Sequence, residues 1–300
     1  SITECCSNLS NRWERQFMPE ESGRPSLLET EEYIEQAYFF RALRERLDQG
    51  VSTQELIKTI AQEILSTTKL PMALDFMVTE LRYTGGFSTA MARLGHYFTA
   101  FQTFVIREAE REDGRLDFRI ALEILEKEAE YRAKSADPQG VFLYQFETIC
   151  RNRLGYDRGL DAMAQDPVYD ENWKEWILSL RRQVGLIDIA DMIFVRSQYY
   201  QSLKGEIGKP VLFGEKEGKI ALANRRKDPL YLFSALSRHL GYPSVPRPRK
   251  EESVVQNYYA LLRRVEQLER RIKLLEEEHR GGIDLSQFFV RNEDQNKSGR

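Results

Sequence analysis

The fold class is indicated most clearly by residues 52–86, STQELIKTIAQEILSTTKLPMALDFMVTELRYTGG. Ser52 and Glu55 have the spacing of a capping box, in which each side chain binds the other residue's free backbone N–H at a helix start. Apolar residues then recur at helical steps of three and four, at Leu56, Ile57, Ile60 and Ile64. Pro71 occupies a position that the first turn of a helix tolerates, and the closing glycine pair is typical of a helix end. The stretch therefore predicts two consecutive helices.

The same signals extend the helical prediction in both directions. Ser26 with Glu29 predicts a helix that runs to about residue 48. Later segments with helical periodicity cover residues 88–113, 116–135, 138–154, 170–184 and 188–203. Residues 1–26 contain few apolar side chains, so we expect them to be a flexible arm. The prediction is a mainly α protein with a multi-helix body over residues 27–203.

Residues 204–250 have a different character. The segment PVLFGEKEGKIALA, residues 210–223, has two short apolar runs on either side of a charged, glycine-flanked turn, which predicts one small β-hairpin. Asp228 and Pro229 then start a helix that Gly241 ends, with a predicted buried face of Tyr231, Leu232, Ala235, Leu236 and Leu240. The proline-rich YPSVPRPRK that follows is expected to be a stiff spacer. We describe residues 204–250 as a basic hairpin-helix module with its spacer.

A repeating apolar pattern follows the spacer over residues 251–280. Its members are separated alternately by four and three residues, the period of a coiled coil, and they are Val254, Tyr258, Leu261, Val265, Leu268, Ile272 and Leu275. The sequence therefore predicts a C-terminal coiled coil. The polar tail, residues 281–300, contains an apolar cluster that we interpret as a candidate docking peptide, formed by Ile283, Leu285, Phe288 and Phe289.

Composition excludes several classes of protein. The chain has 300 residues, of which 41% are hydrophobic and 30% charged, enough for a sizeable core. Its 44 basic and 47 acidic residues give a net charge of −3, so no overall field attracts nucleic acid or an acidic membrane. The three cysteines form no disulfide or zinc framework, and Cys5 and Cys6 are interpreted as arm residues without a chemical role. With no long apolar run and no signal-peptide core, we expect no membrane span and a cytoplasmic location.

No motif predicts catalysis, a metal or a cofactor. GFSTA, residues 86–90, has the outline of a nucleophile elbow, but helical sequence precedes it, so Ser88 is interpreted as a helix cap. GEIGKP, residues 205–210, lacks the spacing and the hydroxyl of a phosphate-binding loop. Acidic runs at 108–113 and 123–130 are interleaved with basic residues and are interpreted as solvated helix faces. We therefore expect no cofactor and a protein that is not an enzyme.

Arginine and aromatic residues are concentrated between residues 151 and 176. This mixture is favoured at binding surfaces, and the candidate recognition surface consists of Arg151, Arg153, Arg158, Tyr169, Trp173 and Trp176. The alternative interpretation is a corner between helices, held together by pairs of aspartate and arginine.

The sequence leaves three functions open. The leading hypothesis is a non-enzymatic scaffold or adaptor that binds a protein partner, itself or another, through residues 251–280 and presents the helical body. The second is association with nucleic acid through the basic residues of 225–250, namely Arg225, Arg226, Lys227, Arg247, Arg249 and Lys250. The third is a helical small-ligand-binding protein or enzyme with a pocket near His96.

Overall fold

The computed structural model describes residues 27–47, 51–111, 116–134, 136–183, 187–205 and 208–247, and further along only Val265 and Ile272. The chain divides into two compact units, residues 1–248 and 249–300. In the described part of the first unit, thirteen helices and no strand are present, which confirms the prediction of a mainly α protein. No helix among these residues is long and apolar enough to cross a membrane.

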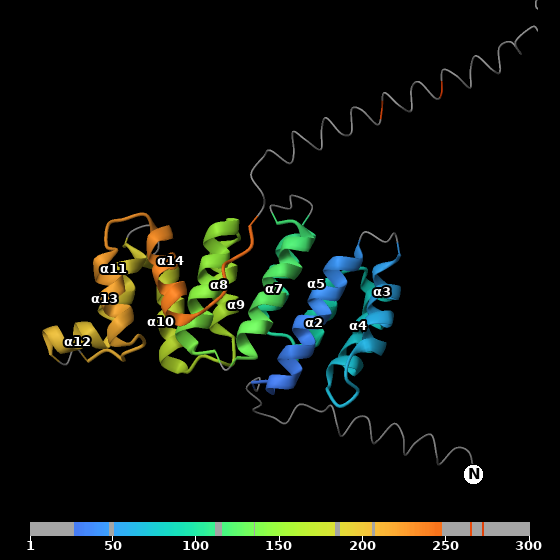
Figure 1. Ribbon diagram of the computed structural model, residues 1–300, viewed down its shortest axis with the longest axis horizontal. Coiled ribbons are helices and arrows are strands. Elements are labelled where there is room, and N and C mark those ends of the chain that lie inside the picture. The colour runs from blue at the N-terminus through green and yellow to red at the C-terminus, as the bar shows by residue number, and fades with distance from the viewer. Residues whose placement is uncertain are drawn as a thin grey trace, which may run out of the picture. The chain divides into compact units, whose positions relative to one another are not determined.

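The helices of the first unit lie side by side in a row, from α3 and α4 at one end to α12 and α13 at the other (Figure 1). Their bounds are α2 (Thr30–Arg46), α3 (Thr53–Glu63), α4 (Leu70–Thr84), α5 (Phe87–Arg93), α6 (Ala100–Glu110), α7 (Phe118–Arg132), α8 (Pro138–Asn152), α9 (Tyr156–Ala164), α10 (Glu171–Gln183), α11 (Ile189–Val195), α12 (Gln198–Lys204), α13 (Glu215–Ala223) and α14 (Pro229–Leu240). Helix α2 packs against α7, and α6 contacts α5, α7 and α9. Helix α6 therefore links α5 to α9.

The two helices predicted over residues 52–86 are confirmed. The Ser52 hydroxyl accepts a hydrogen bond from the Glu55 N–H at 3.3 Å, at the start of α3. Pro71 lies in the first turn of α4, and Gly85 ends that helix with a φ of 70°, a left-handed conformation that favours glycine. The apolar face predicted for the first of these helices is buried. Local capping signals therefore identify these elements correctly.

The single helix predicted over residues 88–113 is wrong. The chain leaves the helix after Arg93 and starts again at Ala100, because Thr99 and Gln102 form a capping box. The Gln102 N–H donates to Thr99 Oγ1 at 3.2 Å, and the Thr99 N–H donates to Gln102 Oε1 at 3.1 Å. Ser88 does not cap a helix; it lies inside α5, and its N–H donates to the Glu110 carboxylate at 2.9 Å.

Two other segments also differ from the prediction. The helix predicted over 188–203 is divided into α11 and α12, since the Ser197 hydroxyl caps α12 by accepting from the Tyr200 N–H at 3.2 Å. Helix α9 was not predicted, although the LGYDRGL sequence around it contains the Gly155 that precedes its first turn. Both errors come from capping residues inside or next to apolar patterns.

The β-hairpin predicted over residues 210–223 is also wrong. Its second half is α13, in which Lys219 Nζ lies 2.5 Å from Glu215 Oε1 one helical turn earlier. The only extended pairing near it among the described residues is the isolated bridge between Ser197 and Phe213. Gly218 lies inside α13 and not in a turn. A Cβ atom on it would lie only 2.6 Å from Ser197 Cβ. The glycine lets α13 approach the start of α12 closely.

We therefore expect Gly218→Ala to destabilise the protein, although alanine is the better helix former. The added methyl group would collide with the buried Ser197 side chain, and overpacking of this kind costs about 1–3 kcal/mol. Urea unfolding of the variant and of Lys216→Ala, an exposed position in the same helix, measures the effect. A Gly218→Ala protein more stable than the wild type would contradict this packing.

The proline-rich segment packs on the body along the part that the structure describes. Tyr242 and Val245 are buried, and the Asn152 amide Nδ2 donates to the Pro246 carbonyl at 3.1 Å. On α14, which begins and ends as predicted, Tyr231 is exposed and Phe233 is buried in its place. The segment therefore packs on α8 up to its last described residues, which the prediction of a stiff spacer did not include.

Several predictions fall outside the described residues. The heptad segment 251–280 is described only at Val265 and Ile272, which are both helical and exposed. The candidate docking peptide in the tail and the arm of residues 1–26, with Cys5 and Cys6, also lie outside them. These predictions stay predictions.

Candidate functional site

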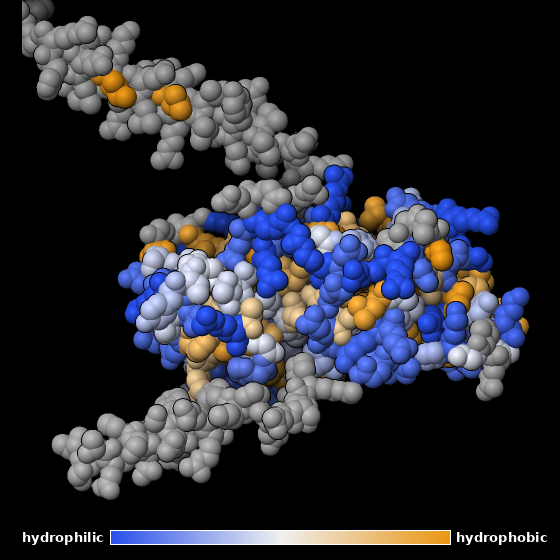
Figure 2. Space-filling view, turned by 180° about the vertical axis from the view of Figure 1, so that it is seen from behind, coloured by the Kyte–Doolittle hydropathy of each residue, from blue (hydrophilic) through white to orange (hydrophobic). Residues whose placement is uncertain are grey.

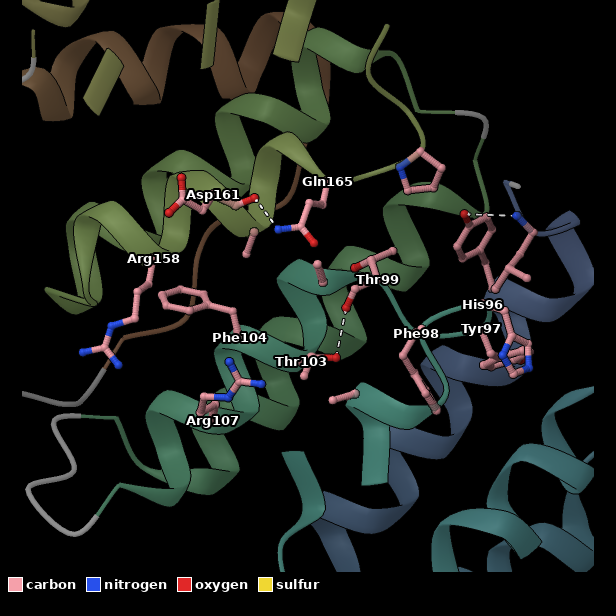
Figure 3. A pocket seen from close by; sticks show the side chains of 17 residues that line it. His96, Tyr97, Phe98, Thr99, Thr103, Phe104, Arg107, Arg158, Asp161 and Gln165 are labelled. Carbon is pink, nitrogen blue, oxygen red and sulfur yellow. Dashed lines mark hydrogen bonds between the residues drawn. The ribbon is translucent and has the colours of Figure 1, made fainter. Parts of the chain in front are cut away.

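A pocket of about 420 Å³ opens between α6, α9 and the turn that joins α5 to α6 (Figure 3). The volume is in the range of small-molecule sites, roughly 300–1,000 Å³. His96 is one of its lining residues, so the pocket lies where the third functional hypothesis expects one. Alanine and threonine side chains of α6 form part of its wall and leave the space open.

Close helix packing positions the two long walls of the pocket. A Cβ atom on Gly159 of α9 would lie 2.6 Å from Ile149 Cδ1 and 3.2 Å from Phe104 Cε1, so any larger residue would require the Ile149 side chain to shift. The Gly155 N–H at the start of α9 donates to the buried Glu108 carboxylate of α6 at 3.4 Å. These contacts hold α9 against α6 and so define the width of the pocket.

Charged side chains gather at one end of the pocket. Arg107 of α6 and Arg158 of α9 are both exposed there, and Figure 3 shows them on the same side as the Phe104 ring. Arg158 Nη1 lies 4.0 Å from Glu108 Oε1, the limit of an ion pair. Asp161, the acidic residue of the lining, is bound by Arg181 at 2.8 Å. The end of the pocket near the two arginines is therefore positively charged.

The opposite end of the pocket is formed by His96 and Tyr97 (Figure 3). Desolvation, with a smaller contribution from the positive charge of Lys69, lowers the pKa of His96 below its ordinary value. The ring is therefore neutral at pH 7. The Tyr97 hydroxyl donates to the Glu32 carboxylate at 2.7 Å and is buried, which fixes this end of the wall.

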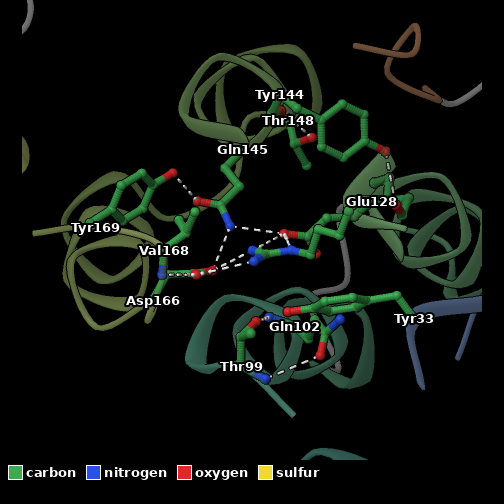
Figure 4. A network of polar contacts seen from close by, with 12 residues as sticks. Tyr33, Thr99, Gln102, Glu128, Tyr144, Gln145, Thr148, Asp166, Val168 and Tyr169 are labelled. Carbon is green, nitrogen blue, oxygen red and sulfur yellow. Dashed lines mark hydrogen bonds and ion pairs between the residues drawn. The ribbon is translucent and has the colours of Figure 1, made fainter. Parts of the chain in front are cut away.

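A buried ion-pair network lies next to Tyr33, one of the lining residues of the pocket (Figure 4). Tyr33 lines the pocket, and the Arg132 guanidinium carbon lies 6.0 Å from the centroid of its ring. Arg132 Nη2 is 2.9 Å from Glu128 Oε1 and also binds Asp166. The side chains of the three charged residues are exposed by only 3%, 1% and 0% in that order. The solvated helix face predicted for 123–130 is therefore wrong at Glu128.

A glutamine completes the network and joins a third element to it. Gln145 Nε2 of α8 donates to Glu128 Oε1 at 2.8 Å and to Asp166 Oδ2 at 3.0 Å. Gln145 Oε1 accepts from the Tyr169 hydroxyl at 2.9 Å. Burial raises the pKa of the Glu128 carboxyl, since two carboxylates share one guanidinium away from water. The network connects α7, α8 and the segment after α9, and it holds the wall of the pocket in place.

The candidate recognition surface is corrected by the burial of its aromatic members. Tyr169, Trp173 and Trp176 are only 3%, 5% and 3% exposed. They form a cluster with Phe142 and Phe213, in which ring centroids lie between 4.8 and 6.2 Å apart. These rings are core side chains that join α8 and α10.

The arginines of the same set lie at separate places. Arg151 pairs with Glu147 one turn earlier on α8, and Arg153 ends that helix in a left-handed conformation with a φ of 53°. Arg158 alone is brought to the pocket. The six residues therefore do not form one surface.

The basic module is partly neutralised by the body. Arg225 pairs with Asp191, and its guanidinium carbon lies 5.7 Å from the centroid of the Phe194 ring. The backbone N–H of Arg226 donates to the Asp188 carboxylate at 2.7 Å, whereas the residue itself is exposed. Lys227 and Arg247 are exposed, and Arg249 and Lys250 lie outside the described residues. The described part of the module thus presents less positive charge than its composition indicates.

Tyr33, Arg107 and Asp161 were not candidate residues in the sequence, because the pocket is assembled from segments far apart in the chain. The Thr99–Gln102 capping box is the one local signal for its edge. In the described ranges, no group of three or more His, Cys, Asp or Glu residues is arranged to hold a metal ion. Comparison with protein-family models, curated proteins and solved structures finds no match to this chain.

Proposed function

We propose that this protein is a non-enzymatic adaptor that self-associates through its heptad segment, residues 251–280, and presents the helical body. The observation that carries the proposal is the state of Val265 and Ile272. Both are helical, both are exposed, by 43% and 54%, and they occupy the same position of the seven-residue repeat. An apolar stripe on a helix needs a partner surface, and a second copy of the same stripe supplies one.

The contacts that hold residues 240–242 on the helical body support an adaptor function. The Tyr242 hydroxyl lies 2.9 Å from both the Glu147 carboxylate and the Phe233 carbonyl, and Tyr131 donates to the Leu240 carbonyl at 3.1 Å. These contacts anchor the chain to the body just before the second unit begins at residue 249. Assembly of the second unit would therefore bring the bodies of the assembled chains together.

We expect Leu268→Asp to convert the assembled protein to single chains. An aspartate in the apolar seam would bury an unpaired charge, which a coiled coil of about three heptads does not tolerate. Light scattering of the full chain gives the mass directly, and far-UV circular dichroism shows whether the helical body is retained.

Gln267→Asp is the matched control, because it adds the same charge at a neighbouring position outside the apolar repeat. We expect it to keep the wild-type mass. A wild-type protein with the mass of one chain, or a Leu268→Asp variant that stays assembled, would contradict self-association through this segment.

The pocket near His96 favours a second function, the binding of a small ligand by the helical body. Its volume of about 420 Å³, its mixed aromatic and polar lining and its fixed walls are features of small-molecule sites. This function is compatible with assembly, because the pocket and the heptad segment belong to different units of the chain.

A further inference from the structure

We propose that the pocket takes a small organic anion, with its acidic group at Arg107 and Arg158 and its apolar body toward His96. The inference rests on the ligand-binding function proposed for the pocket and adds the chemical class of the ligand and the residues that select it. Carboxylate, sulfonate and phosphate groups share the chemistry that two guanidinium groups recognise.

The charge balance at the arginine end carries the proposal. Among the described residues, Arg107 has no ion-pair partner. The carboxylate nearest to Arg158 is Glu108, which already accepts from the Gly155 N–H and lies 3.3 Å from Arg111. Asp161 is held by Arg181 at 2.8 Å. Two guanidinium groups therefore face the same end of a cavity in which the acidic residues are used by other contacts.

The rest of the lining fits an apolar and flat ligand body. Phe104 lies beside the two arginines in Figure 3, and Tyr33 contributes a second ring to the wall. Ala100 and Thr103, one turn apart on α6, leave room between them. Thr103 Oγ1 donates to the Thr99 carbonyl at 3.2 Å, so it turns its polar atom to its own helix.

The distribution of charge along the pocket sets the orientation of the ligand. Arg107 follows Thr99, the N-cap of α6, by eight positions, which corresponds to about 12 Å along the helix axis. His96, at the far end, is neutral at pH 7 because its pKa is lowered. The lining thus carries two cationic side chains at one end, whereas His96 and Tyr97 at the other end are neutral, which suits an anion with a single acidic group.

The test compares two fluorescent probes of the same shape on the full chain. Anilinonaphthalene sulfonate carries an acidic group on a flat aromatic body, and N-phenylnaphthylamine is the same body without that group. We expect the sulfonate to bind at least about tenfold more tightly, since a charge-assisted hydrogen bond is worth about 1.5–3 kcal/mol. The double variant Arg107→Gln/Arg158→Gln is expected to remove that difference.

Two further variants locate the probe and separate the two levels of the proposal. Arg82→Gln removes an exposed arginine of α4, outside the pocket, and is expected to leave both affinities unchanged. Ala92→Trp fills the pocket from an exposed lining position and is expected to weaken both probes. If both probes bind equally and only Ala92→Trp weakens them, the anion class is overturned while the pocket remains a ligand site. If Ala92→Trp has no effect, or neither probe binds, both proposals are overturned.

Discussion

Replacing Arg132 with methionine is expected to lower the free energy of unfolding by about 3–5 kcal/mol, the usual cost of removing one partner from a buried ion pair. Methionine fills a similar length but leaves Glu128 and Asp166 as two buried carboxylates with no cation between them. Their remaining donors are Gln145 Nε2 and the Val168 N–H, at 2.8–3.1 Å. Urea unfolding followed by far-UV circular dichroism measures the loss.

The matched control for this prediction is Arg41→Met. Arg41 also pairs with two carboxylates, Glu126 and Glu130 of α7, but its side chain is 43% exposed. An exposed ion pair is worth at most about 1 kcal/mol, so we expect a small loss here. Equal effects of the two substitutions would show that the buried network is no special determinant of stability.

The pH dependence of the network follows from Glu128. The pKa of Glu128 is higher in the folded protein than in the unfolded protein. The stability that this carboxyl contributes is therefore fully present below the unfolded pKa, and it is lost as the pH rises through the folded pKa. Arg132 lowers the pKa of Glu128, so its removal raises that pKa further. The defect of Arg132→Met relative to the wild type is therefore expected to shrink as the pH falls from 7 toward 5. In Glu128→Gln, which cannot ionise, the loss at rising pH is expected to disappear.

Local signals account for the helices that the sequence predicts correctly. The Ser52 side chain accepts a hydrogen bond from the Glu55 N–H, and the Asp228 side chain accepts one from the Leu230 N–H. Both contacts lie within three residues of the side chain that makes them. Such signals need no knowledge of the rest of the fold. The Thr99–Gln102 capping box is a signal of the same kind, and the wide apolar stripe over 88–113 concealed it.

Long-range packing accounts for what the sequence does not predict. Gly218 lies in a sequence that is typical of a turn. Its lack of a side chain instead makes room for Ser197, twenty-one residues earlier in the chain. Glu128 and Arg132 have the spacing of a solvated ion pair, and only Asp166, thirty-four residues away from the arginine, makes them a buried network. The pocket likewise combines α6, α9 and the start of α2. Partners at such separations leave no periodic trace in the sequence.

Replacing Trp176 with alanine is expected to destabilise the body by about 3–5 kcal/mol, the range for removal of a large buried ring. The ring centroid of Trp176 lies 4.8 Å from Phe142, 5.5 Å from Trp173 and 5.3 Å from Phe213. These rings belong to α8, α10 and the segment before α13, so the cavity would open where three segments meet. Urea unfolding gives the free energy, and near-UV circular dichroism reports the loss of ordered aromatic packing.

Leu178→Ala, on the same helix, is the control that shows whether Trp176 stabilises the core or serves as a surface residue. Leu178 is 44% exposed, and we expect its removal to change the free energy of unfolding by about 0.5 kcal/mol or less. A recognition residue would behave in the opposite way from a core residue, because its loss would leave stability intact and reduce only the binding of a partner. A Trp176→Ala protein as stable as the wild type would therefore restore the interpretation of residues 151–176 as a binding surface. A loss several times larger than that of Leu178→Ala places the tryptophan in the core that holds α10 against α8.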